Sequence, residues 1–279
     1  MMCGSVSHFL LLGSATSAGL SNGVLPMKRT GERVLTAAGG FNPTWQRHVA
    51  AYALADGFLP QGRLLDVGCG IGHSYHLLAP RETVGLDISP DALEGQQRET
   101  VVADMRELPF EDGEFAAVLS VQSMEHVPDP ERVVAEVARV LEPGGTAMFV
   151  TPNRLTLGRP DEIIDPYHFR EFDHAELKEV CQEYFPQVEI QGLFGSPRYM
   201  EIVLEERAKL DRLLAKDPLR LRRLVPISAK QWLYDAVLLR NREKPDPRAA
   251  AIEVSDFFLA DTDLLEALDV CAVCHRAPA

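Results

Sequence analysis

Short apolar runs alternate along the chain with segments in which apolar residues recur every three or four positions. The runs have strand length and lie at 63–67, 82–89, 101–105, 115–121, 146–153, 187–194 and 268–275. Between them, one-sided apolar patterns predict helices that begin near Pro43, His73, Pro90, Pro130 and Asp173. This alternation predicts a Rossmann-like, doubly wound α/β fold whose seven strands are mainly parallel, with helices on both faces.

Helical spacing also appears between the sixth and seventh runs, at 200–214 and 232–239. This pattern interrupts the connection between two neighbouring strands. We therefore expect residues 197–258 to form a helical cap insertion in a catalytic domain made of residues 41–196 and 259–279.

Charge is distributed unevenly along the chain. The whole chain has a formal net charge of -13, yet residues 197–248 hold thirteen of its 28 Lys and Arg against eight acids. The acidic excess argues against a nucleic-acid binder, which needs a broad positive surface. Two interpretations remain open for the arginines of the insertion: a solvated face, or a pocket wall for an anionic or lipid-linked acceptor with peripheral membrane contact. These arginines are Arg220, Arg222, Arg223, Arg240 and Arg242.

Cysteine usage and the N-terminal segment bear on the compartment. Five scattered cysteines do not form a secreted disulfide framework, so a reduced, cytoplasmic setting is expected. No apolar stretch has the length of a transmembrane segment, and no Lys or Arg precedes the apolar run in the N-terminal segment as a signal peptide requires. We expect residues 1–40 to be a leader that is disordered or reflects a mis-assigned start, with Met27 as the alternative start.

A glycine-rich turn follows the first strand. Gly68, Gly70 and Gly72 would weaken a packed strand, so the backbone itself must be needed there, for a tight turn and for close approach of a ligand. A pyrophosphate-binding fingerprint would place its third glycine at position 73, which is His73. The turn therefore indicates a nucleotide-like ligand but weakens the pyrophosphate interpretation.

Two acids flank this turn in the predicted fold. Asp66 lies directly before the glycines, where a carboxylate repels phosphates and suits a cation. Asp87 lies 21 residues further on, at the end of the second strand, where an acid accepts hydrogen bonds from ribose hydroxyls. Together they predict a ligand with a ribose, no phosphates and a positive charge, which describes S-adenosylmethionine.

Five ordered motifs between residues 64 and 153 resemble those of the class I S-adenosylmethionine-dependent methyltransferases. They are LDVGCGIG, GLDIS, ADMRELPF, SVQSMEHVPDP and LEPGGTAMFVTPN, and the fourth is similar to small-molecule members such as the quinone-biosynthesis methyltransferases. The resemblance implies an antiparallel last strand, an N-terminal helix and S-adenosylmethionine as the cofactor. It implies that the methionine end of the cofactor is bound by Asp66, Gly68, Cys69 and Gly70. It also implies that Asp87 and Ile88 bind the ribose and adenine, that Asp104 and Met105 flank the adenine, and that Gln122 lies below the sulfonium.

The methyl acceptor is expected to be a small molecule, with a hydroxyl oxygen as the accepting atom. His126 and His168 lie in loops after strand ends and are the candidate catalytic residues, as base or substrate contact. Tyr167, Arg170 and Glu171 could instead form with His168 a polar latch for their loop. No His or carboxylate cluster has metal-ligand spacing along the chain, so no metal dependence is predicted.

Several alternatives remain open from the sequence. Arg47, His48 and Tyr52 lie on the entry helix, which in the family often folds over the cofactor, and packing or surface exposure is the other interpretation for each of them. A loose similarity to glycan, glycolipid and natural-product methyltransferases does not name the acceptor. The alternatives for the whole chain are an NAD(P)-dependent oxidoreductase and a catalytically inactive S-adenosylmethionine-binding regulator.

Overall fold

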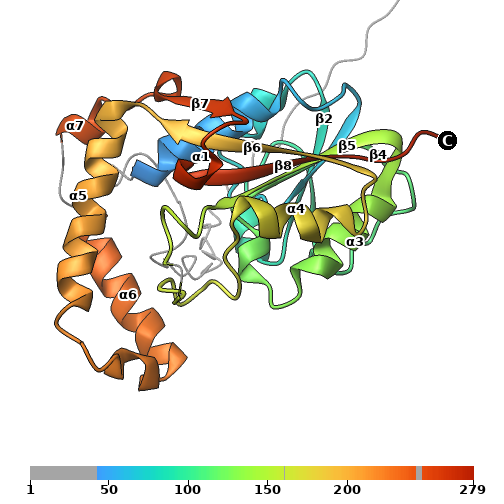
Figure 1. The fold of residues 1–279 in the computed structure, drawn as a ribbon. Helices are drawn as coiled ribbons and strands as arrows, with labels where there is room; N and C mark the ends of the chain where they lie inside the picture. Colours follow the sequence, from blue (N-terminus) through green and yellow to red (C-terminus); the bar gives the residue numbers. More distant parts are fainter. Residues whose placement is uncertain (1–42, 160, 243–246) are drawn as a thin grey trace, which may run out of the picture.

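One twisted sheet forms the centre of the molecule (Figure 1). The computed structural model describes residues 43–159, 161–242 and 247–279, so the predicted leader lies outside the described residues. The sheet has eight strands in the order β3-β2-β1-β4-β5-β8-β6-β7. The strands are β1 Arg63–Val67, β2 Glu82–Asp87, β3 Glu99–Val102, β4 Phe115–Val121, β5 Leu141–Pro152, β6 Gln187–Gly195, β7 Phe257–Ala260 and β8 Asp269–His275.

The pairing confirms the predicted α/β class and its antiparallel last strand. The first five strands pair in parallel, and β8 runs antiparallel between β5 and β6. The sheet has one strand more than the seven predicted, because β7 pairs antiparallel with the outer edge of β6. Its four residues, FFLA, are too few for a recognisable strand pattern, and the first two, Phe257 and Phe258, fall within the predicted insertion.

Helices cover both faces of the sheet, as expected. The α-helices are α1 Pro43–Ala55, α2 Pro90–Leu93, α3 Pro130–Val140, α4 His174–Gln182, α5 Pro197–Leu214, α6 Ile227–Arg242 and α7 Pro247–Ala250. Short 3-10 turns lie at η2 Tyr75–Leu78, η3 Met124–His126, η4 Leu221–Leu224, η5 Val254–Asp256 and η6 Leu264–Glu266.

The prediction of a full helix from His73 is wrong, because only the single turn η2 forms there. The segment between Gly72 and Pro80 is too short to offset the cost of helix nucleation. By contrast, α4 begins where the sequence predicts. Asp173 accepts hydrogen bonds from the amides of Ala175 and Glu176 in a capping box.

Alternation along β1 divides the apolar core between the two faces. Leu65 packs in one core with Val137 of α3 and Leu177 of α4. Leu64, on the other face, packs in a second core with Ala51 of α1 and Tyr199 of α5. Both faces of the central strands are therefore buried. The place available to a ligand is the edge where the parallel strands end.

Helices α5 and α6 form an arm that extends away from the sheet (Figure 1). Both helices fall within the predicted insertion, but the apolar face expected to cover the catalytic domain is largely uncovered. Only Tyr199 and Ile202 of α5 are buried, and Leu204, Leu213 and Trp232 are more than half exposed.

Candidate functional site

The turn after β1 has the geometry expected of a ligand-binding loop. Gly68 and Gly70 both adopt left-handed backbone conformations, with φ of 69° and 53°. A Cβ on Gly68 would lie 2.4 Å from the Cβ of Ser123, so this glycine permits a close approach between two loops. A Cβ on Gly70 would meet nothing within 4 Å, so open space lies against the backbone there.

Asp87 is tied to this loop. The amide of Gly70 donates to its Oδ2 at 2.9 Å, and the amide of Ser89 donates to its Oδ1 at 2.8 Å. The parallel register of β1 and β2 places the ends of the two strands side by side, which brings Asp87 to the glycine turn. The next residue, Ile88, is 66% exposed, which is unusual for a large apolar side chain directly after a core strand.

Asp66 lies beneath the loop and is fully buried. The hydroxyl of Tyr52 on α1 donates to Asp66 Oδ1 at 2.8 Å, and the Arg98 guanidinium donates to Oδ2 at 2.8 Å. Burial raises the pKa of Asp66, although Arg98 and Tyr52 act in the opposite direction. Both carboxylate oxygens are thus engaged by protein groups.

Cys69 belongs to the glycine turn, and Gln96 packs against it. Gln96 Nε2 donates to the carbonyl of Gly70 at 2.8 Å and lies 3.8 Å from the sulfur of Cys69. Burial raises the pKa of the Cys69 thiol to about 12, so the thiol stays protonated at neutral pH. Cys69 therefore packs in the loop as a neutral group and is not an activated nucleophile.

Asp104 and Met105 follow β3 at the same edge. Asp104 forms a bidentate pair with Arg106, and this hydrogen bonding lowers the pKa of Asp104. The Met105 methyl group reaches the glycine turn, because a Cβ on Gly68 would lie 3.3 Å from Met105 Cε.

Gln122, at the end of β4, has a left-handed backbone with φ of 52°. Its amide Nε2 donates to Asp269 Oδ1 at 2.8 Å, and Asp269 Oδ2 lies 3.3 Å from Nε of Arg47 on α1. Burial raises the pKa of Asp269 to about 6, with Arg47 acting against it. Arg47 is itself 6% exposed, so α1 supplies the site with a buried cation.

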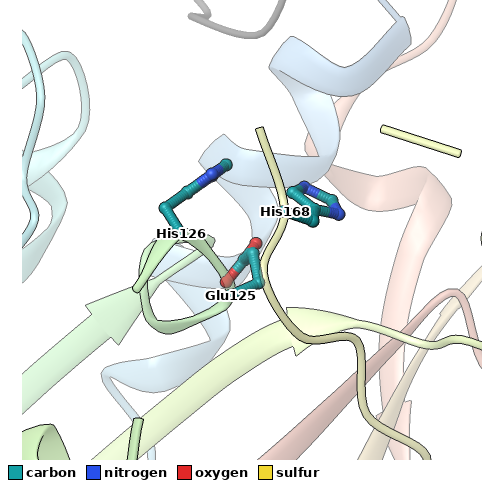
Figure 2. A group of neighbouring side chains, drawn as sticks. All are labelled: Glu125, His126 and His168. Carbon is teal, nitrogen blue, oxygen red and sulfur yellow. The ribbon is translucent and has the colours of Figure 1, made fainter. Parts of the chain in front are cut away.

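His126 and His168 come together although 42 positions separate them in the sequence. Figure 2 shows both rings with Glu125, where the turn after β4 faces the segment that carries His168. The ring centroids are 5.0 Å apart, and one potential ligand atom from each of the three residues lies within 4.8 Å of the others. Glu125 is fully buried, and its Oε1 has no hydrogen-bond partner among the residues described.

The two histidines have different hydrogen-bond partners. His168 Nδ1 lies 3.0 Å from Glu171 Oε1. Burial lowers the pKa of His168, but the hydrogen bond to Glu171 and the charges of Glu125 and Asp165 outweigh it and raise the pKa to about 9. His126 Nδ1 lies 3.2 Å from the carbonyl oxygen of Tyr167, which can only accept a hydrogen bond. Nδ1 of His126 therefore carries the proton when the ring is neutral, and Nε2 carries the lone pair.

The loop after β5 also has the polar contacts of a latch. The Tyr167 hydroxyl donates to Asp235 of α6 at 2.8 Å, and Arg170 pairs with Glu131 of α3. The contacts of Glu171 with His168 and of Tyr167 with Asp235 anchor the segment that carries His168.

Sequence reasoning missed several polar partners of this site. Arg47 and Tyr52 are buried, as the packing interpretation expects, but the sequence did not indicate that each pairs with a buried acid. Arg98 and Glu125 were not singled out. Their signal was present, since a charged residue in a segment that must be buried needs a partner, but the sequence alone does not say which partner.

Three arginines of the arm form ion pairs with acids of a neighbouring loop. Arg220 pairs with Asp161 at 2.6 Å and Arg222 with Glu162 at 2.5 Å, while Arg223 lies 3.2 Å from the same Glu162 carboxylate. The acids belong to the loop after β5. The side chains of Arg240 and Arg242 lie outside the described part of the chain. In the described segments, no helix is both long enough and apolar enough to cross a membrane.

Comparisons with known proteins agree on one class. Residues 65–149 match the family model of a methyltransferase domain. The chain is 29% identical over 265 residues to a probable S-adenosylmethionine-dependent methyltransferase of Mycolicibacterium smegmatis, covering 88% of this chain and 94% of the relative. It is 34% identical over 137 residues to tocopherol O-methyltransferase of Arabidopsis thaliana, a match that covers 44% of this chain and 38% of that relative.

A solved structure supports the same fold. The possible histamine N-methyltransferase of Thermotoga maritima superposes with a TM-score of 0.55 at 16% identity, covering 84% of this chain and 91% of that chain. The chain is a class I S-adenosylmethionine-dependent methyltransferase. S-adenosylmethionine is its cofactor, and the open space over Gly70 beside Asp87 fits a ligand that lies against the loop. This assignment replaces the alternative of an NAD(P)-dependent oxidoreductase.

Proposed function

We propose that the enzyme transfers a methyl group from S-adenosylmethionine to a hydroxyl oxygen of a small-molecule acceptor. In this proposal the acceptor is a glycan, a lipid-linked compound or a natural product. The observation that carries this proposal is the group formed by His126, His168 and Glu125 at the edge where the parallel strands end. The partial similarity to a tocopherol O-methyltransferase supports an oxygen acceptor.

The cofactor supplies an electrophilic methyl group on a positively charged sulfur. We propose that residues at or after the ends of β1, β2 and β3 bind this cofactor. Asp87 accepts from the ribose, and Ile88, Asp104 and Met105 border the adenine. Gly68, Cys69 and Gly70 present backbone atoms to the methionine end. The contacts of Asp66 with Tyr52 and Arg98 make its own contribution indirect, through those two side chains.

The two histidines have different roles in this proposal. His126 acts as the general base, because Nε2 has a lone pair that can accept the hydroxyl proton. His168 is a poor proton acceptor at neutral pH, because its raised pKa keeps it protonated. Its positive charge instead stabilises negative charge that develops on the acceptor oxygen. Gln122 directly follows β4, and the hydrogen bond to Asp269 fixes the position of its side chain.

The test is transfer of a tritiated methyl group to a panel of hydroxyl-bearing small molecules. We expect His126→Ala to lower kcat by roughly 10²-fold or more and to leave the affinity for S-adenosylhomocysteine unchanged. His76→Ala, at an exposed position in η2, is the matched control. Undiminished kcat in His126→Ala would contradict the base assignment. Cofactor binding with no labelled product from any acceptor would favour the inactive regulator.

A further inference from the structure

The end of the arm exposes an unusual set of large apolar side chains. Residues 216–230 comprise the connection from α5 to α6 and the first turn of α6, and this segment is called the tip. Leu219 is 78% exposed and Leu224 is 81% exposed, the two highest values for large apolar residues in the part of the chain that the structure describes. Leu221 and Ile227 are 57% and 58% exposed. Exposed apolar residues gathered on one short segment indicate an interaction surface.

The tip is also a basic part of an acidic protein. It carries five Lys and Arg and one acid, whereas the whole chain has a formal net charge of -13. The side chains of Arg220 and Arg223 are 47% and 43% exposed while they pair with Asp161 and Glu162. Both side chains therefore remain partly exposed on the segment that carries the leucines.

The fold holds the tip outward. Tyr167 donates to Asp235 of α6, and Tyr234 of α6 donates to Asp165, so two hydrogen bonds fix α6 to the loop after β5. Arg222 is tied to Glu162 in the same loop. The exposed leucines thus sit on a segment whose base is anchored, at the end of the arm away from β6 and β7 (Figure 1).

A cavity connects the tip with the candidate catalytic group. It has a volume of about 230 Å³ and lies between the start of α6 and the loop after β5. Val225 and Ile227 of the tip line this cavity together with Ile163, Tyr234 and His168. An apolar or amphiphilic molecule that enters beside the tip therefore reaches His168 along a largely apolar wall.

We propose that the tip docks the enzyme on an anionic lipid bilayer. Leu219, Leu221 and Leu224 enter the boundary between headgroups and acyl chains, and the neighbouring arginines and lysines contact lipid phosphates. Docking places the mouth of the cavity at the bilayer surface. An amphiphilic, lipid-linked acceptor then enters the cavity from the bilayer, a step that rests on the proposed function.

Charge favours a bilayer over a second copy of the chain. A symmetric dimer through the tip would place the same arginines and lysines opposite one another. Like charges across such an interface repel, whereas anionic headgroups complement both the basic and the apolar side chains. A second copy is therefore an outcome that the test must separate.

The test is co-sedimentation of the full chain with vesicles. We expect binding to vesicles of phosphatidylcholine with phosphatidylglycerol, weaker binding to phosphatidylcholine alone, and loss of affinity at high salt. The Leu219→Ser/Leu224→Ser variant should lose roughly tenfold or more in vesicle affinity. Leu265→Ser, at a 60% exposed leucine in η6, is the matched control and should bind as the unmodified chain does.

Two further measurements make the outcome decisive. S-adenosylhomocysteine affinity should be the same in the leucine variant as in the unmodified chain, which shows that the variant folds. Equal vesicle binding by the leucine variant and the unmodified chain, or no binding at all, would overturn the proposal. So would a concentration-dependent dimer in light scattering that the variant abolishes. Because vesicle binding needs no methyl transfer, its failure is distinguishable from failure of the proposed function.

Discussion

The side-chain amide of Gln122 donates a hydrogen bond to Asp269 at 2.8 Å, although 147 positions separate the two residues. Gln122 directly follows β4 and Asp269 begins β8, and the antiparallel register that pairs Pro152 with Asp269 brings β8 to this edge. Arg47 of α1 reaches the same carboxylate. Three elements therefore meet where the cofactor's sulfur is proposed to lie, and Asp269 positions both Gln122 and Arg47.

The first prediction concerns this buried pair. Asp269→Ala should lower the free energy of unfolding by about 3 kcal/mol or more, because Arg47 is left buried without a counter-charge. Arg47→Met/Asp269→Ala should recover part of that loss, since neither charge then remains. Chemical denaturation of the two single variants and the double variant measures the coupling. Additive losses would show that the two side chains do not depend on each other.

The second prediction separates two glycines of the same turn. Gly68→Ala should destabilise the fold by roughly 1–3 kcal/mol or more, because its Cβ meets Ser123 at 2.4 Å. Gly70→Ala should cost only about 1–2 kcal/mol for its left-handed backbone, since nothing lies within 4 Å of the added carbon. Its main effect should be a loss of affinity for S-adenosylhomocysteine. Urea unfolding and calorimetric titration give the two readouts, and unchanged affinity in Gly70→Ala would place the cofactor elsewhere.

The third prediction is a pH dependence that follows from His168. Its pKa of about 9 in the folded protein exceeds the ordinary value of 6.5. The folded state therefore binds the proton more tightly, and this stabilisation is fully present below the ordinary value and lost as pH rises through about 9. The shift corresponds to about 3 kcal/mol. Denaturation across this range should show that loss in the unmodified chain and in the control His76→Gln but not in His168→Gln, and equal losses in all three would refute the assignment.

The fourth prediction addresses metal dependence. Glu125, His126 and His168 have suitable donor atoms within 4.8 Å, which their separation in the sequence concealed. A metal ion would have to displace the proton that His168 holds at neutral pH, and Glu125 and Glu171 already face that positive charge. We expect methyl transfer to be unchanged after dialysis against a chelator. Loss of activity that Mg²⁺ or Zn²⁺ restores would contradict this expectation.

The fold could be predicted because its signals are local. The apolar runs, the glycine turn and the capping box at Asp173 each depend on neighbours within a few positions. The placement of Asp87 beside the glycine turn followed from one further rule, that adjacent parallel strands end at a common edge.

What the sequence did not reveal depends on contacts between distant segments. Arg98 and Tyr52 share the carboxylate of Asp66, yet nothing near them in the sequence specifies that partner. The exposure of Leu204 and Leu213 was also hidden, because a helical apolar pattern predicts burial whether or not a surface is present to cover it. The division of the chain into a catalytic domain and a cap over residues 197–258 remains a prediction.

The central claim is that the turn after β1, together with Asp87, binds a ribose-containing cofactor without phosphates. Calorimetric titration of the purified chain with S-adenosylhomocysteine, beside Asp87→Ala and the exposed control Asp91→Ala, tests it most directly. The account predicts binding by the unmodified chain and the control, and a loss of roughly 10- to 100-fold in Asp87→Ala. Equal affinity in Asp87→Ala, or binding of NAD in place of S-adenosylhomocysteine, would contradict it.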